Sequence, residues 1–155
     1  MKILFAIDLS EPPAVTKAVE ALAARLGAEL FVLHVMDPAP AAAMAPVDPL
    51  TGLSGYAPYA LYDPQLEDNI ARAEEHAMQT FLTERFEQPV RAALRLGEPA
   101  PTILEDAEEH DVDLIVLGRR HHSRLERLFL GSVASDVLAK TTRPTLFMPI
   151  ETEAS

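Results

Sequence analysis

The sequence predicts an α/β fold in which a five-stranded, mostly parallel sheet carries helices on both faces, a doubly wound sandwich of the flavodoxin or Rossmann type. Three observations support this class. Short apolar runs alternate with amphipathic segments along the chain. The first two runs are joined by one amphipathic segment, the pattern of a βαβ unit with parallel strands. The length of 155 residues suits one domain, expected at residues 1–150, with a frayed tail at 151–155.

The first βαβ unit begins with a strand at Lys2–Ile7, a continuous apolar run. Ser10 is a suitable N-cap for the following helix, and two prolines fit its first turn, where backbone N–H groups have no helical partner. Apolar residues then recur at helical spacing until Gly27, which we expect to end the helix. A second apolar strand is expected at Glu29–Val35.

Residues 37–65 interrupt this alternation, since they are rich in proline and alanine and show no periodicity. A loop of this length in a compact domain is either functional or a tolerated surface insertion. The functional alternative is a lid over a ligand, with Tyr56, Tyr59 or Tyr62 packed on it.

The second half of the chain completes the alternation. Its expected helices lie at Leu66–Phe86, around Ile103–His110 and at Val133–Thr141, and its expected strands at Val90–Leu96, Leu114–Leu117 and Pro144–Ile150. The strand at Val90–Leu96 alternates apolar and basic residues, which is typical of an exposed or edge strand.

Charge and cysteine content exclude several classes of function. The formal net charge of −11 argues against binding to nucleic acid or to an anionic membrane. The chain has no cysteine, which excludes disulfides and cysteine-based zinc sites and suits a reducing compartment. The first apolar run is too short for a signal peptide, and no run reaches transmembrane length. We therefore expect a cytoplasmic protein without membrane insertion.

A candidate anion site lies between the fourth strand and the fourth helix. Gly118 follows the strand, and Gly131 and Ser132 begin the helix. Backbone N–H groups at a helix N-terminus favour negative charge, and glycine lets a phosphate approach the backbone closely. The Ser132 hydroxyl can contact a phosphate or act as the N-cap of the helix.

The segment between these glycines is basic although the chain is acidic. Four of the ten arginines fall between Arg119 and Arg127, and only Glu126 opposes them. We expect this cluster, which Arg119 and Arg120 begin, to neutralise phosphates. The alternatives are a solvated face paired with local acids and a docking surface for an acidic partner.

Asp8 follows the first strand. In doubly wound sheets, ligands bind beyond the carboxyl ends of the strands, where the winding reverses. If the first and fourth strands are neighbours, Asp8 and the turn at Gly118 meet in this crevice. The plain alternative is that Asp8 only caps the turn that follows it.

Four segments resemble the universal stress protein family: its first strand with acidic residue and helix cap, the end of its second strand, its closing helix and its closing strand. They are Ile3–Glu11, Leu33–Asp37, Gly131–Ala134 and Pro144–Met148. The ATP-binding branch of this family carries a glycine, two residues, a second glycine, nine residues, a third glycine and a serine or threonine. Gly118, Gly131 and Ser132 match this spacing, and His121 stands at the second glycine position.

The resemblance implies a homodimeric stress-response protein that holds an adenine nucleotide, ATP alone or with Mg²⁺ or Mn²⁺, in the crevice. Carried over by position, Asp8 and Val35 line the adenine and ribose side. The residues implied around the phosphates are Gly118, Gly131, Ser132 and Val133.

The departure at His121 is expected to weaken nucleotide binding without abolishing it, because a side chain stands where the family has none. An imidazolium beside a phosphate donates a charge-assisted hydrogen bond, so affinity is expected to fall as pH rises. Family members without the glycine pattern supply one alternative, a stress protein that acts through protein partners. A slow ATPase is the second alternative, although no P-loop lysine or metal-binding acid follows Gly118.

The remaining candidates point to no catalytic or metal site. His121 and His122 are adjacent and lack a third ligand at suitable spacing. His34 lies in an apolar strand and is expected to be a core histidine with satisfied nitrogens. The last strand, Pro144–Ile150, is strongly apolar for a sheet edge, and we expect it to form the dimer contact.

Overall fold

The computed structural model describes residues 1–37, 64–120 and 131–150, and the statements below concern these residues. The elements in chain order are β1 (Lys2–Ile7), α1 (Pro13–Leu26), β2 (Glu29–Met36), α3 (Pro64–Arg85), β3 (Arg91–Leu96), α4 (Pro99–Glu109), β4 (Leu114–Arg120), α5 (Ser132–Lys140) and β5 (Thr145–Ile150). The strands form one parallel sheet in the order β3-β2-β1-β4-β5. The predicted α/β class is confirmed.

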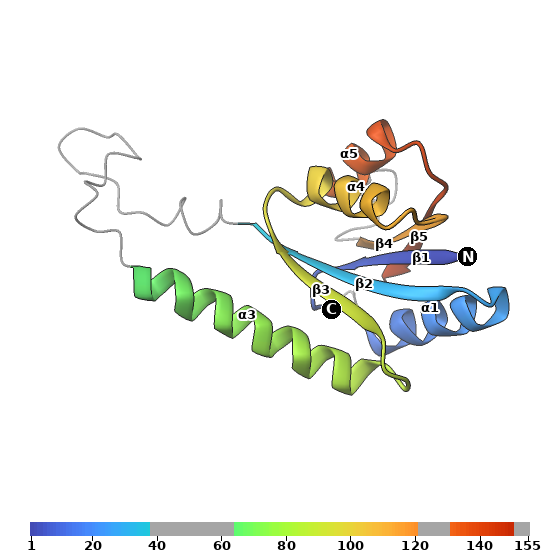
Figure 1. Cartoon of the computed structure of the whole chain (residues 1–155). Helices are drawn as coiled ribbons and strands as arrows, with labels where there is room; N and C mark the ends of the chain where they lie inside the picture. The colour runs from blue at the N-terminus through green and yellow to red at the C-terminus, as the bar shows by residue number, and fades with distance from the viewer. Residues whose placement is uncertain (38–63, 121–130, 151–155) are drawn as a thin grey trace, which may run out of the picture.

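The sheet is covered on both faces, with α4 and α5 on one side and α1 and α3 on the other (Figure 1). Successive side chains of β1 point to opposite faces of the sheet, each of which has its own apolar core. Leu4 and Ala6 pack beneath α4 and α5, whereas Ile3, Phe5 and Ile7 pack against α1 and α3. A central strand that is buried on both faces needs a continuous apolar run, which explains the sequence of β1.

The connection from β1 to α1 differs from the prediction. The N-cap of α1 is Pro12, without a side-chain hydrogen bond, so the prediction that Ser10 caps this helix is wrong. The Ser10 N–H and hydroxyl instead donate to Asp8 Oδ1, at 3.0 Å and 2.5 Å. Leu9, between Asp8 and Ser10, adopts a φ of 69°, a left-handed conformation that costs free energy in any residue with a side chain. Ser10, which we expected to cap the helix, therefore belongs to a tight turn that follows β1.

The other boundaries lie close to those expected. Gly27 ends α1 with a φ of 58°, as predicted. At the start of α5, Gly131 is the N-cap and Ser132 the first helical residue, so of the two alternatives for Ser132 the N-cap role is wrong by one position. The strand β3 pairs only with β2 and β5 only with β4, which makes both of them edge strands.

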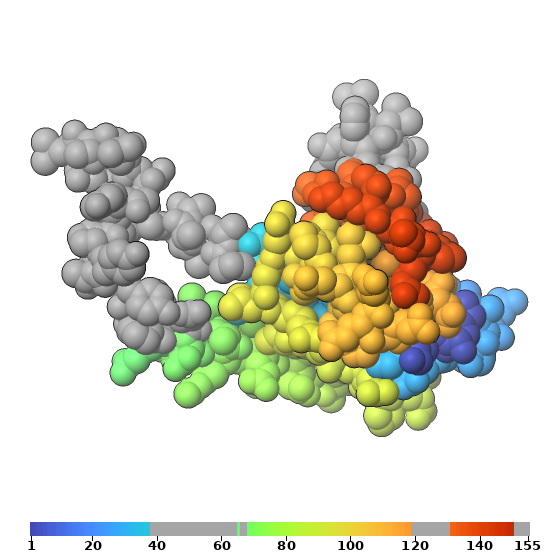
Figure 2. Space-filling model, turned by 45° about the horizontal axis from the view of Figure 1, so that its top comes forward, coloured from blue at the N-terminus to red at the C-terminus, as the bar shows by residue number. Residues whose placement is uncertain are grey.

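Helix α3 begins at Pro64, two residues before the expected Leu66, so residues 64 and 65 belong to this helix and not to the loop expected at 37–65. Its first turns extend away from the sheet (Figures 1 and 2). Phe81 is buried near its C-terminal end, whereas Ile70 is 38% exposed. The lid hypothesis for the tyrosines and the prediction of a frayed tail concern residues 38–63 and 151–155, which lie outside the described residues.

His34 of β2 is buried, and both of its ring nitrogens have partners. Its Nδ1 lies 3.0 Å from the Ile7 carbonyl oxygen and its Nε2 lies 2.9 Å from Glu74 Oε2 on α3. The prediction of a satisfied core histidine is confirmed.

In the part of the chain that is described, none of the helices has both the length and the apolar character needed to span a bilayer.

Candidate functional site

The central position of β1 brings the expected site residues to one end of the sheet. β1 pairs with β2 on one side and with β4 on the other, with Ile7 opposite His34 and Ala6 opposite Leu117. The carboxyl ends of these three strands therefore meet where the winding of the sheet reverses, which is where ligands bind in folds of this class. The assumption that the first and fourth strands are neighbours is confirmed.

A pocket of about 180 Å³ opens at this end of the sheet. Its walls come from the ends of β1, β2 and β4 and from the first turns of α4 and α5. The lining residues are Ala6, Ile7, Asp8, Glu11, Leu33, Val35, Pro99, Ile103, Leu117, Gly118, Val133 and Ala134. The lining is apolar except for two carboxyl groups, so the pocket combines an apolar wall with a small number of polar groups, as ligand sites do.

Four of the expected site residues line this pocket together: Asp8, Val35, Gly118 and Val133. Gly131 and Ser132 lie directly before Val133 at the exposed start of α5 and are not among the lining residues.

The basic side of the expected site is described only in part. Arg119 and Arg120 end β4, where they pair with Pro149 and Ile150 of β5, and only their backbone is described. His121 and the rest of the basic segment lie outside the described residues, so their expected roles stay predictions.

Glu11 is the acidic residue of the pocket that the sequence analysis did not select. Its side chain is only 3% exposed. Its Oε1 accepts a hydrogen bond of 2.9 Å from the Asp8 N–H, and its Oε2 is buried without a hydrogen-bond partner. Burial, and after it the negative charge of Asp8, raise the pKa of Glu11 from 4.5 to about 7. Glu11 is therefore a carboxyl group that titrates near neutral pH.

The reason for overlooking Glu11 lies in the turn that precedes α1. With Ser10 as the N-cap, Glu11 falls in the first helical turn, where acidic residues are common and solvated. The turn at Ser10 instead places Glu11 before the helix and turns its carboxyl group inward. A second acid three residues after Asp8, at the end of a central strand, was the available signal.

The two described glycines of the motif have different surroundings. A Cβ atom at Gly118 would lie 2.7 Å from Ile150 Cδ1, so Ile150 has to shift before a side chain fits there, and 3.7 Å from Glu11 Oε1, an ordinary contact. A Cβ atom at Gly131 would meet nothing within 4 Å, and its φ of −59° suits any residue. Nothing in the described structure requires glycine at 131, which leaves a bound ligand as a reason for it.

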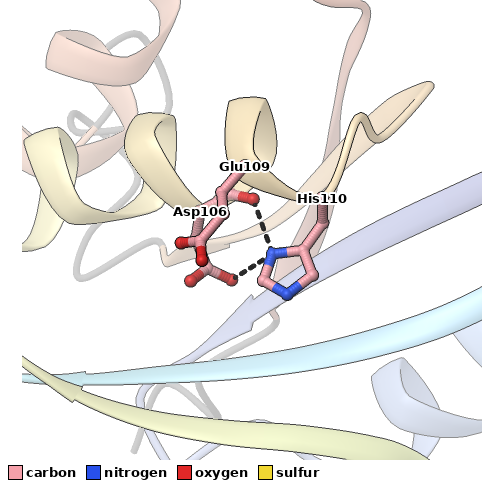
Figure 3. A group of neighbouring side chains, drawn as sticks. All are labelled: Asp106, Glu109 and His110. Atoms are coloured by element: carbon pink, nitrogen blue, oxygen red, sulfur yellow. Dashed lines mark hydrogen bonds and ion pairs between the residues drawn. The ribbon is translucent and has the colours of Figure 1, made fainter.

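A histidine and two acids gather at the end of α4, where Asp106, Glu109 and His110 place possible metal-ligand atoms within 4.8 Å of one another (Figure 3). His110 Nδ1 lies 2.9 Å from the Asp106 carbonyl oxygen and 3.4 Å from its Oδ2. Arg95 of β3 donates to Asp106 Oδ1 and Glu109 Oε2, each at 3.0 Å. Because a guanidinium already supplies the positive charge, we assign this cluster to joining β3 and α4.

A larger hollow of about 720 Å³ lies at the opposite end of the sheet, beside the start of β2 and β3. Ala24 and Ala28 line its floor, and Glu29 and Arg91 are joined by an ion pair of 2.9 Å at its rim. It lies at the end of the sheet opposite the switch of winding. The smaller pocket is therefore the better candidate despite its volume.

Comparisons with known proteins agree with this geometry. Universal stress protein YxiE of Bacillus subtilis is 34% identical over 152 residues, covering 95% of this chain and 97% of that one. The solved structure of MJ0577 of Methanocaldococcus jannaschii matches with a TM-score of 0.71 at 23% identity, covering 98% and 97% of the two chains.

Two further structures of the same fold were solved with ligands. One is a universal stress protein in complex with cAMP, at 18% identity and a TM-score of 0.56. The other is the universal stress protein of Archaeoglobus fulgidus in complex with dAMP, at 23% identity and a TM-score of 0.52. They cover 97% of this chain and 98% of each matched chain. Residues 1–149 match the universal stress protein family, and the chain therefore belongs to that family.

Proposed function

We propose that this protein binds an adenine nucleotide, ATP in the first instance, in the crevice between β1, β4 and α5, and that it acts as a cytoplasmic, homodimeric stress-response module. The observation that carries the proposal is the pocket in which Asp8, Val35, Gly118 and Val133 come together at the switch of winding. The cAMP and dAMP complexes of two proteins of the same fold support the choice of an adenine ligand.

The size of the pocket suggests which part of the nucleotide it holds. Its volume of about 180 Å³ lies below the roughly 300–1,000 Å³ of pockets that enclose a whole ligand. The apolar lining suits the base and sugar, with Asp8 as an acceptor for ribose hydroxyl groups. The phosphates then extend toward the start of α5, where the N–H groups of the first turn face outward without helical partners. Mg²⁺ or Mn²⁺ would accompany the phosphates.

Replacing Gly131 by valine tests this arrangement. A β-branched side chain fills the space that a phosphate needs beside the first turn of α5, so we expect ATP affinity to fall about tenfold or more. The free protein has room for the side chain, so folding is expected to be unaffected. Calorimetry with ATP, with and without Mg²⁺ or Mn²⁺, measures the change in affinity.

Ala139→Val is the matched control, because it adds a β-branched residue at an exposed position near the other end of α5. If wild type and Gly131→Val bind ATP with equal affinity, the phosphates do not bind at the start of α5. A wild type that binds no adenine nucleotide at millimolar concentration would overturn the proposal and favour a family member that acts through protein partners.

A further inference from the structure

Glu11 combines burial with an incomplete set of hydrogen bonds. Its Oε2 is the only buried side-chain polar atom among the described residues that lacks a hydrogen-bond partner. The other oxygen, Oε1, accepts from the Asp8 N–H at 2.9 Å and lies beside Gly118, 3.7 Å from where a Cβ atom would stand. Glu11 thus stands in the wall of the pocket with hydrogen-bonding capacity that the free protein does not use.

Among the residues that the structure describes, the groups around the Glu11 carboxyl supply no positive charge. Gly118 of β4 and Ile150 of β5 contribute no charge, and the neighbour at the end of β1 is the acidic Asp8. Within the described part of the chain, no lysine, arginine or histidine contributes to the pKa of Glu11. An ionised Glu11 therefore adds a second negative charge to the crevice with little solvent to screen it.

We propose that Glu11 selects ligands by charge: when protonated it admits phosphate-bearing nucleotides to the crevice, and when ionised it disfavours them. The inference rests on the proposed function, since it concerns the ligand of the same pocket. A neutral ligand such as adenosine escapes the selection because it carries no charge for the carboxylate to repel. The residue therefore sets which adenine compounds the site prefers at a given pH.

The direction of the pH dependence follows from the pKa of about 7. A bound phosphate disfavours ionised Glu11 and raises its pKa further, so binding takes up a proton between the two pKa values. Affinity for a phosphate-bearing ligand is therefore highest below pH 7 and declines as pH rises toward the pKa of the complex. One proton limits this decline to about tenfold per pH unit, so the expected loss from pH 6 to pH 8 is up to about tenfold.

Glu11→Gln tests the proposal, because the amide resembles the protonated carboxyl and keeps an oxygen for the Asp8 N–H. Calorimetry is carried out on wild type and variant with cAMP, ATP and adenosine at pH 6 and pH 8. cAMP is the main probe because its phosphodiester keeps one charge over this range. We expect the variant to bind cAMP and ATP as the wild type does at pH 6 and up to about tenfold more tightly at pH 8, with adenosine affinity equal in both proteins.

Two controls separate Glu11 from other titrating groups. Glu75→Gln removes an equal charge from an exposed position of α3 and is expected to behave as wild type. Any contribution of His121 or of the ATP phosphates is common to wild type and variant, so the comparison between them isolates Glu11. Circular dichroism and thermal unfolding check that Glu11→Gln folds.

The remaining outcomes overturn the proposal in distinguishable ways. If adenosine and cAMP bind but the two proteins do not differ at pH 8, Glu11 does not select by charge, although the proposed function stands. If Glu11→Gln weakens all three ligands at both pH values, the ionised carboxylate is an acceptor for the nucleoside, and the proposal is wrong. If no adenine compound binds either protein, the proposed function and this inference fail together.

Discussion

At the scale of single residues, glycine has two physical meanings in this site. Gly118 lies against Ile150 and Glu11, and the space for its Cβ is already occupied by Ile150 Cδ1 at 2.7 Å. Ile150 is buried in the core beneath α1 and α3 and cannot move freely. Packing therefore favours glycine at 118 before any ligand is considered, whereas it places no such constraint on position 131.

We expect Gly118→Ala to lower the free energy of unfolding by about 1–3 kcal/mol, the range for inserting a methyl group into a filled core. Gly131→Ala, at an open and conformationally ordinary position, is expected to stay within about 0.5 kcal/mol of wild type. Urea unfolding followed by circular dichroism measures both values. Equal stability of Gly118→Ala and wild type would show that Ile150 moves aside without cost.

Residue by residue, the site was only partly predictable. Asp8 and Gly118 follow from their places at strand ends, whereas Val35 and Val133 follow only from the resemblance to the universal stress protein family, and the pocket brings these four together. Glu11 did not follow, because its burial depends on a turn at Leu9 with a positive φ, a conformation that leucine seldom adopts. Local sequence rules favour a capped helix there, whereas the structure has a turn at Leu9 and a hydrogen bond from the Asp8 N–H to Glu11 Oε1.

At the scale of elements, α3 is joined to the sheet through a small contact. The described apolar side chains buried here are Met78 and Phe81 of the helix and Phe86, which follows it. Glu74 of the helix contributes the interaction with His34. Of the described interactions between α3 and the sheet, this one is nearest the N-terminal end of the helix, whose first turns extend away from the sheet (Figure 1).

Glu74→Ala leaves Nε2 of the buried His34 without its partner, so we expect a loss of about 1–3 kcal/mol and faster cleavage within α3 in limited proteolysis. Glu74→Gln keeps an oxygen within reach of the ring and is expected to lose less. Glu75→Ala removes the neighbouring, exposed carboxylate and serves as the control. Proteolysis of Glu74→Ala at the wild-type rate would show that apolar packing alone holds the helix.

The elements were more predictable than the site because they depend on patterns that extend over many residues. The run of β1 and the spacing in α1 gave boundaries within two residues of those observed. The basic and apolar alternation at Val90–Leu96 gave the edge position of β3. That β1 and β4 are neighbours was assumed rather than predicted, since their pairing joins segments more than 100 residues apart.

At the scale of the whole molecule, β3 and β5 form the two edges of the sheet, and within residues 1–37, 64–120 and 131–150 no further strand pairs with either of them. On β5, Leu146 is 37% exposed, whereas Phe147 packs against the core beneath α4 and α5. Exposed apolar edge strands commonly pair or aggregate unless they are covered. Pro149 lacks a backbone N–H and so limits how far another strand can pair here.

We predict a homodimer in which Pro144–Ile150 of two copies meet. Leu146→Glu is a cleaner test than a change at Phe147, whose contact with the core ties it to folding. Sedimentation is expected to give a dimer for wild type and a monomer for Leu146→Glu, with unchanged circular dichroism. Leu26→Glu, at an exposed leucine at the end of α1, is the control. A wild type that sediments as a monomer at high concentration contradicts the prediction.

The central place of β1 also has a consequence for the growing chain on the ribosome. β1 and β2 are synthesised early, but β4, which covers the other edge of β1, emerges only with residues 114–120. Until then the most apolar strand presents unpaired backbone groups along one side, a template for pairing with other nascent chains. Chains that stall before β4 are therefore the species most exposed to aggregation, and the segment Ile3–Ile7 is where a chaperone would find its target.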